Sequence, residues 1–139
     1  MTPEELAEDL AMLEDWEERY RYIIDLGRNL APMDEARRGD DALVPGCLSR
    51  VWLVADAVPS PEGTRLRIQA DSDAHITKGL VAMALLLYND KTASDIVATD
   101  LDGFFERVDL GSHVSVNRRN GFYSMIGKIR DLARQHVAT

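Results

Sequence analysis

The chain contains a single cysteine, Cys47, within the stretch Val44-Pro45-Gly46-Cys47-Leu48-Ser49-Arg50-Val51-Trp52. A lone thiol cannot form an internal disulfide, and it cannot build a thiolate metal cage by itself. It can act as a nucleophile where its surroundings favour the thiolate. Ser49 and nearby backbone amides are suited to hydrogen-bond a thiolate at this position, and Arg50 is suited to stabilise it by charge.

The position of Cys47 also favours a reactive role. Pro45 and Gly46 predict a turn directly before it, and the apolar run 51–54 directly after it predicts a buried strand. We therefore expect the thiol at a junction between a loop and a strand, where rigid structure holds it and a partner can still reach it.

Other chemistry-bearing residues receive simpler interpretations. His75 and His113 have no metal-site or cysteine-protease spacing, so we interpret them as surface or capping residues. Asp71 and Asp73 form a possible carboxylate pair, but we favour helix capping for both. The sequence has no glycine-rich phosphate loop.

Composition limits the class of protein. With 139 residues and 45% hydrophobic content, residues 1–139 are expected to form one globular domain. Its longest apolar run, 80–88, is far shorter than the roughly 20 residues that cross a bilayer. A net charge of −8 makes nucleic-acid binding unfavourable. An acidic, helix-forming N-terminus and one cysteine favour a cytoplasmic protein without a signal peptide.

The elements that must position Cys47 can be predicted from capping and periodicity. A capping box from Thr2 to Glu5 and an N-cap at Asp15 begin two helices, the second of which ends before Pro32. The charged stretch 31–46 is expected to be a long exposed loop. Further helices are predicted over 74–88, 92–97 and 101–108, and from an N-cap at Asn117 onward.

Two strands are predicted between these helices. Residues 51–58 and 65–70 are separated by the turn residues 59–63, which predicts an antiparallel hairpin. Gly79 interrupts the apolar helix over 74–88, where a glycine costs about 1 kcal/mol relative to alanine. We expect a strand or loop to cross that helix closely at Gly79.

Four blocks of the sequence, in order, resemble the SufE family of sulfur acceptors for cysteine desulfurases. The most specific is Gly-Cys-x-Ser-x-Val-Trp over 46–52. The second block is 16–27, and the third consists of 71–74 together with 76–80. The fourth is Arg118 with Gly121 and Met125. Together they extend over most of the chain, from about Trp16 to Ile129.

The resemblance implies an α/β domain of the α+β type, in which helices pack around a small antiparallel sheet as in iron–sulfur scaffold proteins. It implies that Cys47 accepts persulfide sulfur from a pyridoxal-phosphate-dependent, SufS-like cysteine desulfurase, stimulates that enzyme, and passes the sulfur to an iron–sulfur scaffold. The chain would be an accessory protein with a covalent persulfide intermediate, needing no cofactor or metal of its own. It further implies supporting or docking roles for Gly46, Ser49, Arg50, Asp73, Lys78 and Arg118.

The chemistry agrees with the residues, because a thiolate can take the outer sulfur of a persulfide without an acid–base triad. The loop 31–46 is expected to let Cys47 leave a sheltered position for the partner's active site. Leu48 and Arg50 occupy positions where the family often has glutamine, His75 replaces a small residue, and Asn117 replaces serine. These differences concern the identity of the partner more than the reaction.

Three alternatives remain open at this stage. The same sulfur relay can supply a tRNA-modification or other cofactor pathway through a paralogous desulfurase. A non-catalytic cluster scaffold would need a cluster bridged between two chains, because one chain has only one thiol. A single-cysteine peroxide sensor would need an activated thiol.

Overall fold

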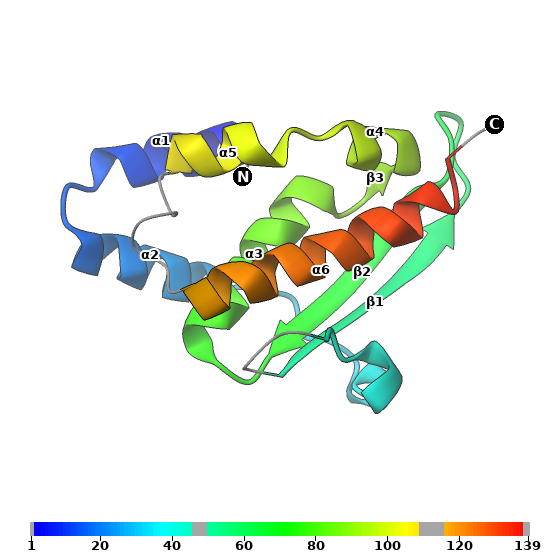
Figure 1. Ribbon diagram of the computed structural model, residues 1–139, viewed down its shortest axis with the longest axis horizontal. Helices are drawn as coiled ribbons and strands as arrows, with labels where there is room; N and C mark the ends of the chain where they lie inside the picture. The colour runs from blue at the N-terminus through cyan, green and yellow to red at the C-terminus, as the bar shows by residue number, and fades with distance from the viewer. Residues whose placement is uncertain (1, 46–49, 109–115, 138–139) are drawn as a thin grey trace.

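The computed structural model describes residues 2–45, 50–108 and 116–137 of the chain, and Figure 1 shows how the elements are arranged. The helices and strands in these ranges are α1 (Pro3–Met12), α2 (Trp16–Arg28), β1 (Val51–Val58), β2 (Arg65–Ser72), α3 (His75–Tyr88), β3 (Lys91–Thr92), α4 (Ala93–Ala98), α5 (Leu101–Val108) and α6 (Val116–Arg134). Two short 3-10 helices, η1 (Glu35–Arg37) and η2 (Asp40–Ala42), lie between α2 and β1.

The first two helices begin where capping chemistry predicts. The Thr2 hydroxyl accepts a hydrogen bond from the backbone N–H of Glu5 at 3.1 Å. The Asp15 carboxylate accepts one from the backbone N–H of Glu17 at 3.0 Å. Each bond satisfies a backbone donor that has no partner within its helix.

The sheet has three antiparallel strands in the order β1-β2-β3. β1 and β2 form the predicted hairpin in the register Val51 with Ser72 through Val58 with Arg65. Gly63 in the connecting turn has φ +126°, a conformation that side chains disfavour. The two-residue strand β3 was not predicted, because it is too short to show a period of its own.

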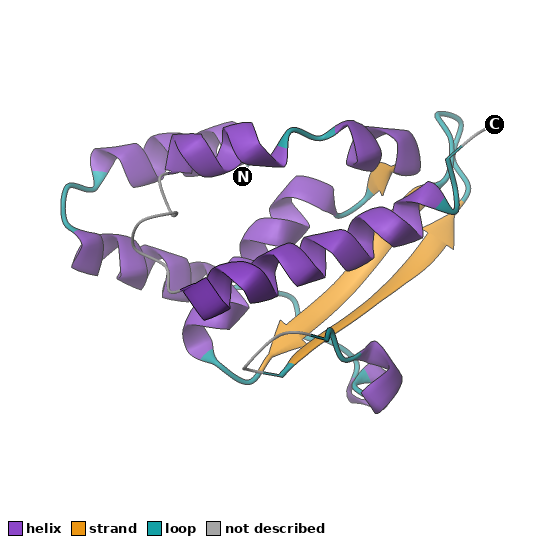
Figure 2. Cartoon of the chain, viewed as in Figure 1, coloured by secondary structure: helices purple, strands orange, loops and turns teal. Residues whose placement is uncertain are grey.

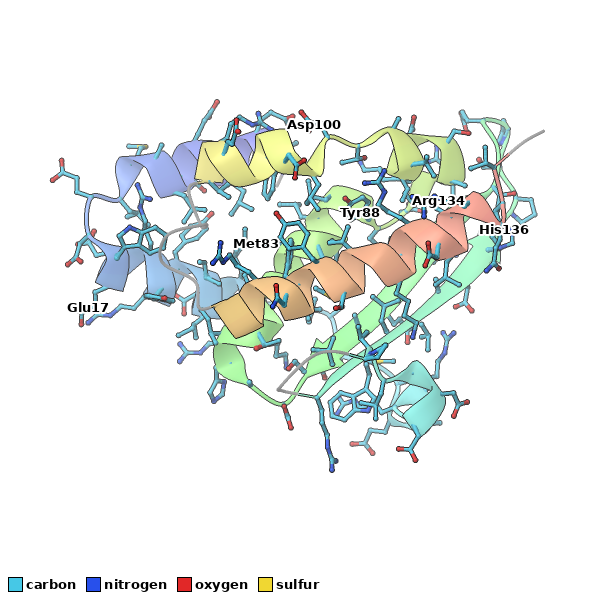
Figure 3. All side chains as sticks on the ribbon, in the orientation of Figure 1. Glu17, Met83, Tyr88, Asp100, Arg134 and His136 are labelled. Carbon is cyan, nitrogen blue, oxygen red and sulfur yellow. The ribbon has the colours of Figure 1, made fainter. Side chains whose placement is uncertain are left out.

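Helices cover one face of this sheet, as Figures 1 and 2 show. α3 packs on β2, α6 lies across the same side, and α1 runs beside α5 in a further layer. Met83 and Tyr88 of α3 are fully buried in the core (Figure 3). The core also takes alternate residues of both long strands, namely Val51, Leu53, Leu66, Ile68 and Ala70. The predicted class, helices packed around a small antiparallel sheet, is confirmed.

Helices α2 and α3 cross at a pair of glycines. A Cβ atom on Gly27 would lie 2.7 Å from the backbone nitrogen of Gly79. A Cβ atom on Gly79 would overlap the backbone carbonyl oxygen of Ile23 in α2. The expected close crossing at Gly79 therefore exists, but the element that crosses is a helix, and the prediction of a strand or loop was wrong.

Two other predictions about the ends of elements were also wrong. α6 begins at Val116, so Asn117 lies inside the helix and is not its N-cap. α3 begins at His75 with Ala74 at the N-cap position, and no side chain caps it. Asp71 belongs to β2 and Asp73 lies in the connection, so neither caps α3, and both serve the site described below.

The stretch 31–45 is held against the sheet rather than extended into solvent. Met33, Ala42 and Val44 are buried, with at most 5% of each residue exposed. Leu43 pairs with Trp52 of β1 through a β-bridge. Most other residues of 31–45 are exposed, as predicted. The sequence did not indicate the buried anchors, because their contacts are made with distant strands.

Candidate functional site

The candidate site is the short stretch that contains Cys47. Gly46, Cys47 and Ser49 lie outside the described residues, but both flanks of the stretch are described. On both sides the chain is fixed, because the backbone N–H of Val44 donates to the carbonyl of Val51 at 2.8 Å. This hydrogen bond and the adjoining Leu43–Trp52 bridge therefore hold together the two described flanks on either side of residues 46–49.

This closure limits where the thiol can go. Cys47 is three residues from Val44 and four from Val51. A fully extended chain spans at most about 3.6 Å per residue, so the Cα atom of Cys47 stays within about 11 Å of that of Val44. Residues 31–45 are anchored to the sheet, and the expected movement of Cys47 concerns residues outside the described part of the chain.

The second flank is fixed by Asp73. Its carboxylate accepts from the backbone N–H of Arg50 at 3.1 Å, and its own backbone N–H donates to the carbonyl of Arg50 at 3.3 Å. The structure thus brings together two of the predicted site residues, Arg50 and Asp73. The Arg50 side chain is exposed, and what fixes the residue is its backbone.

A buried carboxylate, Asp71, lies at the same end of the hairpin as Val51, with only 6% of its side chain exposed. Its Oδ2 accepts from Nη2 of Arg38 at 2.6 Å, and its Oδ1 lies 3.4 Å from Nζ of Lys78. Lys78 is a predicted site residue, and the structure places it on this carboxylate. A buried charge is retained in a fold only when such partners compensate for its lost hydration.

Trp52 completes this network. It is the cross-strand neighbour of Asp71 in the hairpin, and the Arg38 guanidinium lies over its ring, 5.7 Å from the centroid. Such a contact adds a cation–π attraction to the ion pair. Arg37, the preceding residue, forms a paired hydrogen bond with Asp56 of β1 at 2.8 and 2.9 Å. Two consecutive arginines therefore fix the segment before Cys47 to both long strands.

Sequence reasoning missed Arg38, since it stands in an aperiodic charged stretch whose partner is 33 residues away. It also missed Lys128 of α6, which donates to the carbonyls of Ala42 and Leu53 at 3.3 and 3.1 Å. Burial lowers the pKa of the Lys128 ammonium, because the charged form loses hydration. Lys128 therefore connects α6 to both flanks of Cys47. In the sequence, only its position on the inner side of the last helix could have indicated this role.

Replacing Asp71 with alanine is expected to destabilise the protein by about 1–3 kcal/mol. Breaking a fully buried ion pair costs about 3–5 kcal/mol, and the smaller figure applies because about a third of each cationic side chain is exposed. Urea denaturation measures the change in unfolding free energy. The control is Asp25→Ala, which removes an exposed surface pair with Arg28 and should cost under about 1 kcal/mol. Equal losses in both variants would contradict the role of the Asp71 network.

The other predicted candidates are placed as follows. Arg118 lies in the first turn of α6, and the description does not extend to its side chain. His75 is exposed at the start of α3, and His113 lies outside the described residues. Within the described ranges no cluster of three His, Cys, Asp or Glu side chains is arranged to hold a metal ion. Within the same ranges, no helix has both the length and the apolarity to cross a membrane.

Comparison with known proteins assigns this sequence to a family. The family model "SufE: Fe-S metabolism associated domain" matches residues 4–133. An uncharacterised SufE-like protein of Rhizobium etli is 41% identical over 135 residues, covering 97% of this chain and 91% of the relative. Another from Rhizobium meliloti is 42% identical over 130 residues, covering 94% and 93%.

A solved structure shares the fold. The solution structure of a hypothetical protein from Thermus thermophilus superimposes with a TM-score of 0.71 and covers 97% of both chains. Only 16% of the aligned residues are identical, so this similarity concerns the arrangement of elements alone.

Proposed function

The chain belongs to the SufE family, and from that premise we propose that Cys47 accepts sulfur from the persulfide of a SufS-like cysteine desulfurase. The observation that carries the proposal is the hydrogen bond between Val44 and Val51, which fixes the two flanks between which the chain's one cysteine lies in the sequence. A carrier must present its thiol to a second protein at a defined place. A short loop on a rigid hairpin is suited to that task.

The reaction requires only a thiolate and a donor persulfide. The Cys47 thiol first loses its proton to solvent, and its sulfur attacks the outer sulfur of the donor. A new S–S bond forms on Cys47, the S–S bond of the donor breaks, and the donor cysteine leaves as a thiolate. No net oxidation occurs. The pyridoxal phosphate that generates the persulfide belongs to the desulfurase, and this chain supplies the acceptor sulfur.

The supporting residues have separate roles in this proposal. Asp73 fixes the backbone at Arg50, and Lys78 pairs with Asp71 at the same end of the hairpin. Gly46 directly precedes Cys47 in the sequence, where backbone flexibility would serve it, and Ser49 follows two residues later, where hydrogen bonding would serve it. Arg118 is proposed to contribute to structure or docking near the loop, with no part in bond making. Residues 1–139 act as one domain in the cytoplasm, stimulate the desulfurase, and pass the sulfur to an iron–sulfur scaffold.

The proposal is tested by incubating the purified chain with a SufS-like cysteine desulfurase and free cysteine, then measuring the intact mass. We expect the chain to gain the mass of one sulfur atom, and peptide mapping after alkylation to place it on Cys47. Omitting cysteine or the desulfurase provides the control and should leave the mass unchanged. An unchanged mass in the complete reaction, with an active desulfurase, would reject the proposal.

A further inference from the structure

Strand β1 lies at the rim of the described sheet, with β2 along one of its edges (Figure 2). The carbonyls of Val51 and Leu53 point away from β2, where they accept hydrogen bonds from the backbone N–H of Val44 and from Nζ of Lys128. Alternate residues of a strand direct their N–H and C=O groups to the same edge. The N–H and C=O groups of residues 55 and 57 therefore belong to this outer edge as well.

The outer edge of β1 is covered over its first part only. The short segment 42–44 lies antiparallel beside residues 51–53. Past this point, no group of the described residues bonds to the outward N–H and C=O groups of Ala55 and Ala57, and Ala57 is exposed. Two donors and two acceptors of the backbone are therefore available at the edge.

The open part of β1 does not oppose the approach of a further strand. Exposed edge strands usually carry proline, lysine or a bulge that prevents pairing. The segment 51–58 has neither proline nor lysine, and its register with β2 is unbroken. Its one charged residue, Asp56, is paired with Arg37. The two alanines leave room for a neighbouring backbone, so this edge is suited to add one extended segment.

A hollow borders the open edge on the face opposite the helices. It has a volume of 260 Å³, and Val54 of β1 contributes to its lining. The rest of its lining comes from the segment of η1 and η2, namely Ala36, Arg37, Gly39, Asp41 and Ala42. The side chains of an added strand alternate between the two faces of the sheet. Every second side chain of such a segment would therefore lie on the same face as this hollow.

The charge around this hollow is negative. Six carboxylates belong to the segment 34–41 and to the strand residues that it pairs with, namely Asp34, Glu35, Asp40, Asp41, Asp56 and Asp71. Three cations lie among them, Arg37, Arg38 and Lys78, and each offsets one carboxylate. The arginines on the same face of β2 have carboxylate partners of their own. Three negative charges are left without a matching cation, which favours a basic occupant.

We propose that the outer edge of β1, from Val54 to Val58, binds a short, extended, basic segment of another protein. The backbone of that segment bonds to Ala55 and Ala57, and one of its lysine or arginine side chains enters the hollow beside Asp41. The proposal uses no part of the chemistry assigned to the thiol, so the two proposals can fail independently.

A second copy of β1 does not fit this edge. Two-fold pairing centred on Ala55 would place the second strand where Ala42 lies. Pairing centred on Asp56 would bring two like carboxylates opposite each other, which is destabilising. Pairing centred on Ala57 would place Pro59, which has no N–H, opposite Ala55. The occupant is therefore a segment with a different sequence.

The test measures amide hydrogen exchange of the full chain by NMR, with a capped hexapeptide of alternating lysine and valine as the probe. In the protein alone, the amides of Ala55 and Ala57 should exchange at least about tenfold faster than those of Val54 and Asp56, which face β2. Saturating peptide should slow exchange at Ala55 and Ala57 at least about threefold. A peptide of the same composition, with its lysines and valines in two blocks, should bind at least about fivefold more weakly.

Two variants test the edge and the hollow separately. Ala57→Pro removes an outward N–H at an edge position, where proline is tolerated, and should raise the Kd of the alternating peptide at least about fivefold. Asp41→Lys should raise this Kd about threefold or more at low salt, and less at high salt. The matched control is Asp25→Lys, which makes the same charge change at an exposed site on α2 and should leave Kd within about twofold. Circular dichroism checks that each variant is folded.

The following results would overturn the inference. Slow exchange at Ala55 and Ala57 in the protein alone would mean that the edge is already covered. Absence of peptide binding, or equal binding by Asp41→Lys and by a folded Ala57→Pro, would mean that the edge and hollow are not the site. A dimer in sedimentation that protects the same amides would make the occupant a second copy. If Ala57→Pro does not fold, Asp41→Lys and the exchange rates still decide the question.

Discussion

Replacing Cys47 with serine is expected to abolish sulfur acceptance completely while leaving the fold intact. A serine hydroxyl is not ionised at neutral pH and is a far weaker nucleophile toward a persulfide than a thiolate. The chain has no second thiol to replace it. The measurement is the transfer of labelled sulfur from cysteine, through a SufS-like desulfurase, to the protein.

Thermal unfolding provides the control for this variant. Cys47 lies in the sequence between η2 and β1, outside every described helix and strand, so the midpoint should change by no more than a few degrees. Labelled sulfur recovered on the serine variant at the parental level would show that another group carries it, and would remove the basis of the proposed function.

Replacing Gly79 with alanine is expected to produce the largest loss of stability. The added methyl group would overlap the carbonyl of Ile23, which is backbone and cannot rotate away. The helices α2 and α3 would have to separate, and overpacking of this kind costs about 3 kcal/mol or more. A domain with about 5–15 kcal/mol of stability would lose a large part of it, and its thermal midpoint would fall by about 10 °C.

The matched control is Gly127→Ala. The same methyl group is added within a helix, but at a position with no atom in reach, so the variant should be as stable as the parent or more stable. Calorimetry of the two variants checks the difference. Equal midpoints for both would show that the contact between α2 and α3 tolerates a side chain at Gly79.

Local sequence signals predicted most of the elements. Caps at Thr2, Asp15 and Thr92 form the bonds that their residue types indicate, because those bonds join residues three or fewer positions apart. The strand β1 matches its predicted bounds, since its β-branched apolar run and the following turn are local features. The family was likewise recognisable from the ordered blocks around Cys47, and the comparisons confirm it.

Local sequence signals could not predict the long-range contacts. The hydrogen bond from the backbone N–H of Ile68 to Oδ1 of Asn89, and the two-residue strand β3, depend on where α3 ends relative to the hairpin. Asp71 and Asp73 were interpreted as helix caps because a carboxylate before a helix usually has that role. Their partners, Arg38 and the backbone of Arg50, lie more than 20 residues away, and no local pattern indicates them.

The sequence by itself determined which atom can carry sulfur and which segments are helix or strand, because both follow from residue type and from neighbours along the chain. Only the tertiary structure decided how the two flanks of Cys47 are held. It is the pairing of Val44 with Val51, together with Arg38 and Lys128 reaching across to other elements, that fixes the segment before the loop. Each of these bonds joins residues that are distant in the sequence, so it can form only after the fold has brought the two segments together.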